Sequence, residues 1–300
     1  MMVNRRAVIL LAFTYFAFAN AFRQSILLGV LEDNRGHYAG DPNFRTVRAV
    51  FKKNGADWQP FRSNCADQIC LKTVTSGYPR EVDWTITFDG RNLGRVTGRT
   101  PSDFKWYGSV GQQEITSSGP VPTVGQKLTE GFEGGPVFRP LVANSQPYFR
   151  DPDSWKPAEL SSDVIRLYRQ QFRRKFPKVC RTNKRDETQL EPFPYRDEDV
   201  LPVKVYRSNK EWVIVQLHLR GAIDCKDLEA GFDMDDPWFV SNPQKSVEYL
   251  DAGLWLVDAG DYDNDGKSEL LFYISRDNRG GYELFYDDFK KHVSFEYSYH

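Results

Sequence analysis

The sequence has no excess of charge of either sign: 40 Lys and Arg side chains balance 41 Asp and Glu, for a formal net charge of −1. This balance gives no general electrostatic attraction to nucleic acid or to an anionic membrane, so we expect neither as a partner. After residue 21 the sequence also has no apolar run long enough to cross a bilayer. We therefore expect no integral membrane segment in the mature chain.

Common catalytic motifs are absent as well. The sequence has no G-x-S-x-G elbow, no H-E-x-x-H, no phosphate loop and no dinucleotide fingerprint. Its four histidines do not cluster, and His218 falls in an expected strand, where we interpret it as a packed or rim residue. Whether the chain is an enzyme stays open, and the absences favour a protein that is not.

The N-terminus has the three parts of a signal peptide, over residues 1–21. Two arginines begin it, an apolar stretch covers 7–18, and Ala19 and Ala21 form a small-x-small cleavage site. We expect a mature chain that begins near Phe22 and is exported, to the periplasm, the cell surface or the medium. An uncleaved N-terminal anchor is the alternative interpretation.

The sequence has only four cysteines, which fit an exported chain because disulfides persist in oxidising compartments. The simplest pairing joins Cys65 to Cys70 and Cys180 to Cys225, although four cysteines allow three connectivities. Four buried thiols are the alternative. A zinc site is not favoured, because the spacing lacks paired C-x-x-C units.

One short run carries the strongest chemical signal, a loop over residues 261–269 that is typical of a calcium site. Asp261, Asp263 and Asp265 occupy positions 1, 3 and 5, and Gly266 at position 6 can adopt the left-handed conformation that the turn requires. Lys267 would offer its backbone carbonyl, with its side chain in water, and Glu269 would add a fourth carboxylate. Hard oxygen ligands favour calcium over zinc or copper. A metal-free turn rich in Asp and Asn is the alternative.

The flanks of this loop predict strands, because residues 254–257 and 270–274 are short aromatic or β-branched runs. An EF-hand would need flanking helices and a Glu at position 12, where this chain has Phe272. Residues 258–272 instead resemble the calcium loop of the FG-GAP/VCBS repeat family, whose members form blades of extracellular β-propellers. The resemblance covers one copy, about residues 253–298. It implies calcium ligation by the four acids of the loop and by the carbonyl of Lys267.

Along the chain, the patterns predict three regions after the signal peptide. Residues 22–116 are rich in hairpin signals, 117–141 form a Gly- and Pro-rich linker or long loop, and 142–300 form a second β region. The second region contains an amphipathic helix at about 162–176, capped by Ser161 or Ser162, with a basic outer face. That face indicates a contact for an anionic ligand or, as we prefer, an ordinary solvated surface. Four successive strands are expected at the C-terminal end, at 253–258, 269–275, 282–287 and 292–298.

A second acidic segment allows a different function. Acid pairs beside aromatic residues are what a glycosidase needs, and an acidic surface loop has the same composition. The acids are Asp224, Asp227, Glu229, Asp233, Asp235 and Asp236, and the aromatics are Phe232, Trp238 and Phe239. The alternative function is therefore a secreted carboxylate-based hydrolase acting on carbohydrate, and a weaker second calcium site is a further alternative.

Together these patterns predict a mainly-β fold of antiparallel sheets with one prominent helix. Four consecutive antiparallel strands make a propeller blade or one face of a sandwich, and we favour a propeller-like arrangement. The function that we expect is that of a secreted, calcium-binding module that is not an enzyme. Its ligand outside the cell, protein or carbohydrate, is not identified by the sequence.

Overall fold

The structure is a computed structural model. It describes residues 25–33, 45–123, 125, 127–130, 136–147, 149–183, 189–223, 225, 234–276 and 278–298. The predicted signal peptide, with Ala19 and Ala21, lies outside these residues. Within them the fold is mainly β, and its sheets are antiparallel, which confirms the predicted fold class.

The first large sheet is built from the N-terminal part of the chain and closes on itself. Its strands are β1 (Leu27–Asp33), β2 (Arg45–Asn54), β3 (Asp57–Pro60), β4 (Glu81–Phe88), β5 (Arg91–Arg99), β6 (Gln112–Ile115) and β9 (Leu141–Asn144). The order is β1-β9-β4-β5-β6-β2-β3, and β1 also pairs with β2, so six strands form a ring. Two hairpins lie in the region that is rich in hairpin signals: β2–β3, with its turn after Asn54, and β4–β5, with its turn at Asp89-Gly90.

Two further short strands lie where the sequence predicts a linker. β7 (Lys127–Glu130) and β8 (Pro136–Phe138) pair with each other within residues 117–141. β9 then lies between β1 and β4 in the first sheet. The expected boundary at 141 thus falls inside the first sheet, because residues distant in sequence complete its ring.

The second large sheet, with its helix, follows. Its strands are β10 (Lys156–Pro157), β13 (Val200–Arg207), β14 (Val213–Leu219), β15 (Trp238–Ser241) and β16 (Val247–Tyr249), in that order. The helix α3 (Ser162–Lys175) begins after Ser161 and ends one residue before the predicted Phe176. Tyr168 and Phe172 are fully buried where α3 packs on this sheet.

Smaller elements connect these parts. They are α2 (Gln68–Thr75), which the sequence patterns missed, the 3-10 turns η1 (Tyr107–Ser109) and η2 (Asp197–Asp199), and the strand pair β11 (Cys180–Thr182) and β12 (Leu190–Pro192). The Asp67 carboxylate caps α2 by accepting from the Cys70 amide at 2.7 Å.

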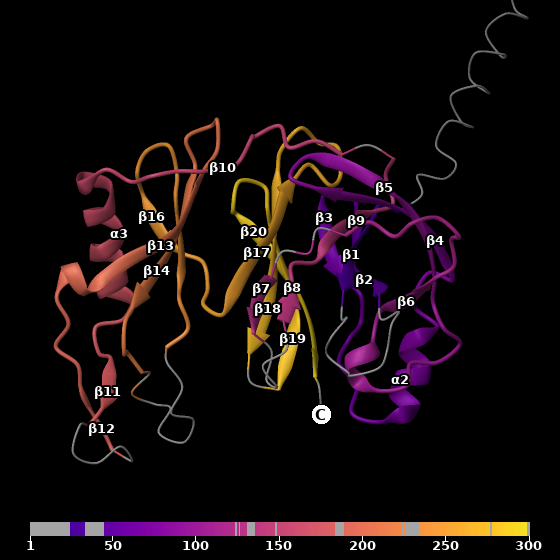
Figure 1. Cartoon of the computed structure of the whole chain (residues 1–300), viewed down its shortest axis with the longest axis horizontal. Coiled ribbons are helices and arrows are strands. Elements are labelled where there is room, and N and C mark those ends of the chain that lie inside the picture. The colour runs from indigo at the N-terminus through magenta and orange to yellow at the C-terminus, as the bar shows by residue number, and fades with distance from the viewer. Residues whose placement is uncertain are drawn as a thin grey trace, which may run out of the picture.

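The C-terminal strands form the middle layer of the molecule (Figure 1). They are β17 (Leu254–Gly260), β18 (Glu269–Arg276), β19 (Arg279–Tyr286) and β20 (Lys291–Ser298), paired in sequence order as predicted. Successive side chains of a strand point to opposite faces. Leu271 and Tyr273 accordingly pack toward the first sheet, whereas Leu270, Phe272 and Ile274 pack toward the second. Burial on both faces explains the uninterrupted apolar run of β18.

The order of β17–β20 is that of a single propeller blade, whereas the ring of the first sheet is not a blade. A propeller-like arrangement of the whole chain stays a prediction.

Both expected disulfides are present, Cys65–Cys70 beside α2 and Cys180–Cys225 joining β11 to the chain after β14.

Candidate metal centre

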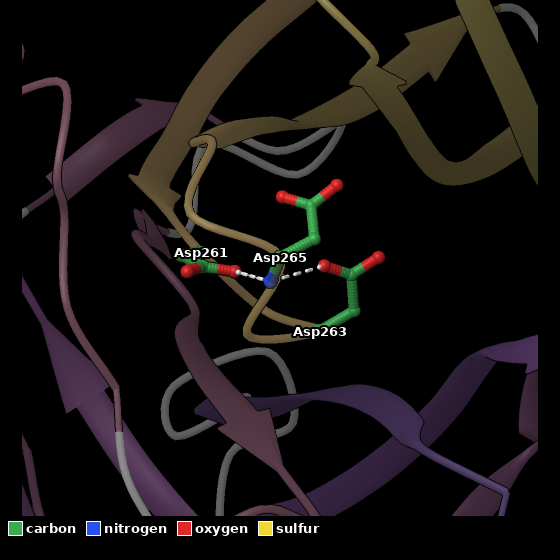
Figure 2. Close-up of side chains that lie close together, drawn as sticks. All are labelled: Asp261, Asp263 and Asp265. Atoms are coloured by element: carbon green, nitrogen blue, oxygen red, sulfur yellow. Dashed lines mark hydrogen bonds between the residues drawn. The ribbon is translucent and has the colours of Figure 1, made fainter. Parts of the chain in front are cut away.

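The predicted calcium loop connects β17 to β18 at the junction of the middle and first sheets. Gly260 and Glu269 are paired across the two strands, so the eight intervening residues must reverse the chain within one strand spacing. The loop brings one carboxylate oxygen each from Asp261, Asp263 and Asp265 within 4.8 Å of one another. Figure 2 shows the three side chains on this turn. Three predicted ligands are therefore together.

Backbone amides of the loop hold all three carboxylates in place. The Lys267 amide donates to Asp265 Oδ1 at 2.9 Å. The Asp265 amide donates to Asp261 Oδ1 at 2.9 Å and to Asp263 Oδ1 at 3.2 Å (Figure 2). The Gly266 amide donates to Asp261 Oδ2 at 2.9 Å. Gly266 has φ of 88°, the left-handed conformation that the sequence predicts, and Asn264 has φ of 63°. The loop thus fixes its acids before any metal binds.

Glu269, the fourth predicted ligand, is buried at the base of the loop, with 2% of its surface exposed. Its Oε2 accepts from the Tyr262 amide at 2.7 Å. Burial, together with the negative charges of the three aspartates, raises the pKa of Glu269 well above its usual value. Burial also raises the pKa of Asp261, although amides of the loop oppose the shift. A bound cation would stabilise the charged forms of both carboxylates.

The sequence predicts that the side chain of Lys267 extends into water, but in the structure this side chain forms two ion pairs. Its ammonium contacts Asp287 Oδ1 at 2.8 Å and Asp288 Oδ2 at 3.0 Å, in the turn between β19 and β20. These two carboxylates raise the pKa of Lys267. The prediction missed this pair because the turn is twenty residues away in sequence.

Residues of the first sheet and of the segment after it also hold the loop, and sequence reasoning did not identify them. Asn144 Nδ2 donates to the Tyr262 carbonyl at 2.8 Å, and the Asp261 amide donates to the Arg150 carbonyl at 2.7 Å. The Ser268 hydroxyl donates to Asp151 Oδ1 at 2.6 Å. The Asp-Pro-Asp-Ser pattern at 151–154 indicates a turn, but nothing in it shows where that turn packs.

The structure describes only part of the second acidic segment. Asp224, Asp227, Glu229, Phe232 and Asp233 lie outside the described residues. His218 Nδ1 lies 2.8 Å from Asp236 Oδ1, and the His218 side chain is partly exposed, as expected of a residue at the rim of its sheet.

Asp235 is exposed, and the partial desolvation of its carboxyl group raises its pKa. The two described aromatics of the segment, Trp238 and Phe239, are fully buried in the cores on either face of β15 and line no cleft. The hydrolase alternative therefore gains no aromatic-lined site here and stays a hypothesis.

The basic face of α3 has partners of its own. Arg173 Nη2 lies 2.6 Å from Asp197 Oδ1, and Arg169 Nε donates to the Val200 carbonyl at 3.0 Å. The Lys175 ammonium lies 4.1 Å above the Tyr249 ring. These contacts agree with the interpretation of an ordinary solvated surface helix.

No helix among the described residues has the length and apolar character that crossing a membrane requires. The two disulfides are consistent with an extracellular protein. Comparison with family models, with curated proteins and with solved structures found no match. The resemblance to the FG-GAP/VCBS repeats therefore rests on the residues of one loop and its flanking strands.

Proposed function

We propose that this chain is an exported calcium-binding β protein, in which the metal rigidifies the turn between β17 and β18, and that the protein acts outside the cytoplasm as a binding or structural module, not as an enzyme. The observation that supports this most is the convergence of Asp261, Asp263 and Asp265 above the buried Glu269. Carboxylate and carbonyl oxygens in this number are the ligands that calcium prefers. The carbonyl of Lys267 would complete the set.

The chemical role of the metal is to neutralise a buried cluster of acids. Glu269 and Asp261 both have raised pKa values because burial and neighbouring carboxylates disfavour their charged forms. Calcium reverses this preference and ties both strand ends together. With a dissociation constant of ~0.1 mM and ~1 mM calcium, linkage adds about 1.4 kcal/mol to the free energy of unfolding.

The test is the melting temperature of the mature protein in EDTA, in millimolar calcium and in millimolar magnesium. We expect a calcium-specific rise in the native protein and none in Asp263→Ala/Asp265→Ala. The matched control is Asp163→Ala/Glu248→Ala, which removes the same charge from two exposed positions on α3 and β16 and should keep the rise. If calcium raises the melting temperature of neither the native protein nor the control, the loop is a metal-free turn and the proposal is wrong.

A further inference from the structure

A lysine from the first sheet extends into the acidic loop. Lys53 lies near the end of β2, about two hundred residues before the loop in sequence, and its ammonium contacts Asp263 Oδ2. Only 13% of the Lys53 side chain and 3% of the Asp263 side chain are exposed. An ion pair as shielded from water as this one interacts more strongly than a surface pair.

Two aromatic rings confine the ammonium of Lys53. Its Nζ lies 5.2 Å from the centroid of the Trp58 ring on β3 and 5.6 Å from that of Tyr286 on β19. Both rings are buried, and both distances are within the range of a cation–π interaction. The positive charge is therefore held at Asp263 by residues of two different sheets.

The charge balance of the loop gives Lys53 its importance. Four carboxylates gather at the loop, and the ammonium of Lys267 is turned away to Asp287 and Asp288. Lys53 thus supplies positive charge beside one of the carboxylates that would bind a metal ion. An ammonium fixed beside a carboxylate lowers the affinity of that carboxylate for a second cation, because the two positive charges repel.

We propose that Lys53 is an internal counter-ion of the loop. Calcium must either displace the Lys53 ammonium from Asp263 or bind against its repulsion. This inference rests on the proposed calcium function and deepens it. Without metal, Lys53 holds the loop closed against the first sheet. With metal, the repulsion by Lys53 weakens calcium binding, so that the site responds to extracellular calcium and remains empty at much lower concentrations.

The test is isothermal titration with calcium, in metal-free buffer, of the native protein and of Lys53→Met. Methionine keeps most of the length of the side chain and removes its charge. We expect Lys53→Met to bind calcium about tenfold more tightly than the native protein. Lys52→Met is the matched control, because the neighbouring Lys52 is exposed and carries the same charge, and its affinity should stay within about twofold of native.

A second pair of proteins tests whether the effect acts through Asp263. In an Asp263→Asn background the further change Lys53→Met should alter calcium affinity less than it does in the native background, because the paired carboxylate is gone. Circular dichroism of each variant without calcium verifies that it is folded.

The outcomes separate the two proposals. Equal affinities of the native protein and Lys53→Met, or weaker binding by the variant, would overturn the counter-ion role and leave the calcium site standing. Binding by Lys53→Met alone would support the counter-ion role and overturn the proposed calcium function of the native protein. Absence of binding in all five proteins would overturn the calcium function, and the inference with it.

Discussion

The junction between the first and middle sheets contains a buried ion pair whose removal gives a sharp test of the fold. Arg48 on β2 is 2% exposed, and its Nε and Nη2 contact the two Glu32 carboxylate oxygens at 2.7 and 3.0 Å. The Tyr282 hydroxyl, from β19, donates to Glu32 Oε1 at 2.9 Å. The guanidinium lies 4.1 Å above the ring of Tyr297 on β20. The pair thus joins the two sheets.

The change Glu32→Gln removes the negative charge and keeps the shape of the side chain. Burial alone lowers the pKa of Arg48, but Glu32, together with Tyr297 and Tyr282, raises it above the usual value, and the guanidinium stays charged. Without Glu32 a buried positive charge remains uncompensated, which costs about 3–5 kcal/mol of the free energy of unfolding. For a protein of this size the melting temperature should fall by on the order of 10 °C.

Urea unfolding, followed by tryptophan fluorescence and far-UV circular dichroism, measures this loss. The control is Glu81→Gln, which breaks the exposed pair of Glu81 with Arg99 and should cost less than about 1 kcal/mol. The double variant Glu32→Gln/Arg48→Met removes both charges and should recover most of the loss. A cost of Glu32→Gln no larger than that of Glu81→Gln would refute the reasoning, as would a double variant as unstable as the single one.

Two further predictions concern a buried acid and the disulfides. Burial raises the pKa of Asp258 to about 7, so the folded protein keeps a proton that the unfolded chain releases near pH 4. The free energy of unfolding should therefore fall by about 4 kcal/mol as pH rises from about 4 to about 7, and urea unfolding at a series of pH values measures this fall. In Asp258→Asn the fall should be smaller by about the same amount; a pH dependence equal to that of the native protein would contradict the prediction. The Cys180–Cys225 disulfide spans 45 residues, and replacing both cysteines by serine should lower the free energy of unfolding by about 4 kcal/mol. The same change at Cys65 and Cys70, whose disulfide spans 5 residues, should lower it by about 2 kcal/mol. Equal losses in urea unfolding would contradict this prediction.

Features that depend on neighbours in sequence were predictable. The four C-terminal strands, the helix at 162–175 and the left-handed Gly266 all follow from local patterns of apolar residues, caps and turns. The two disulfides follow from an even count and the simplest pairing. The signals for the strands, the helix and the turn are strong because each is decided within a few residues of the chain.

Features that depend on pairing between distant parts of the chain could not be predicted from the sequence. The insertion of β9 between β1 and β4 joins residues more than one hundred positions apart, and no spacing rule identifies which strand completes a ring. The helix α2 was missed because it is short and lies among polar residues, although Asp67 and the spacing of Leu71 and Val74 are a weak helix signal. The contact of Lys53 with the loop could not be predicted either, because the two lie about two hundred residues apart in sequence.

The position of the loop decides what a bound cation would stabilise. Beyond its own sheet, the loop contacts Asn144 of β9, Lys53 of β2 and the segment of Arg150 and Asp151 that follows the first sheet. A turn exposed at the edge of a sheet opens by local fraying, and a metal there protects only that turn. This loop cannot open without breaking contacts with the first sheet. Calcium that binds here would therefore raise the free energy of global unfolding, and its effect should appear in the same transition that the Arg48–Glu32 pair controls.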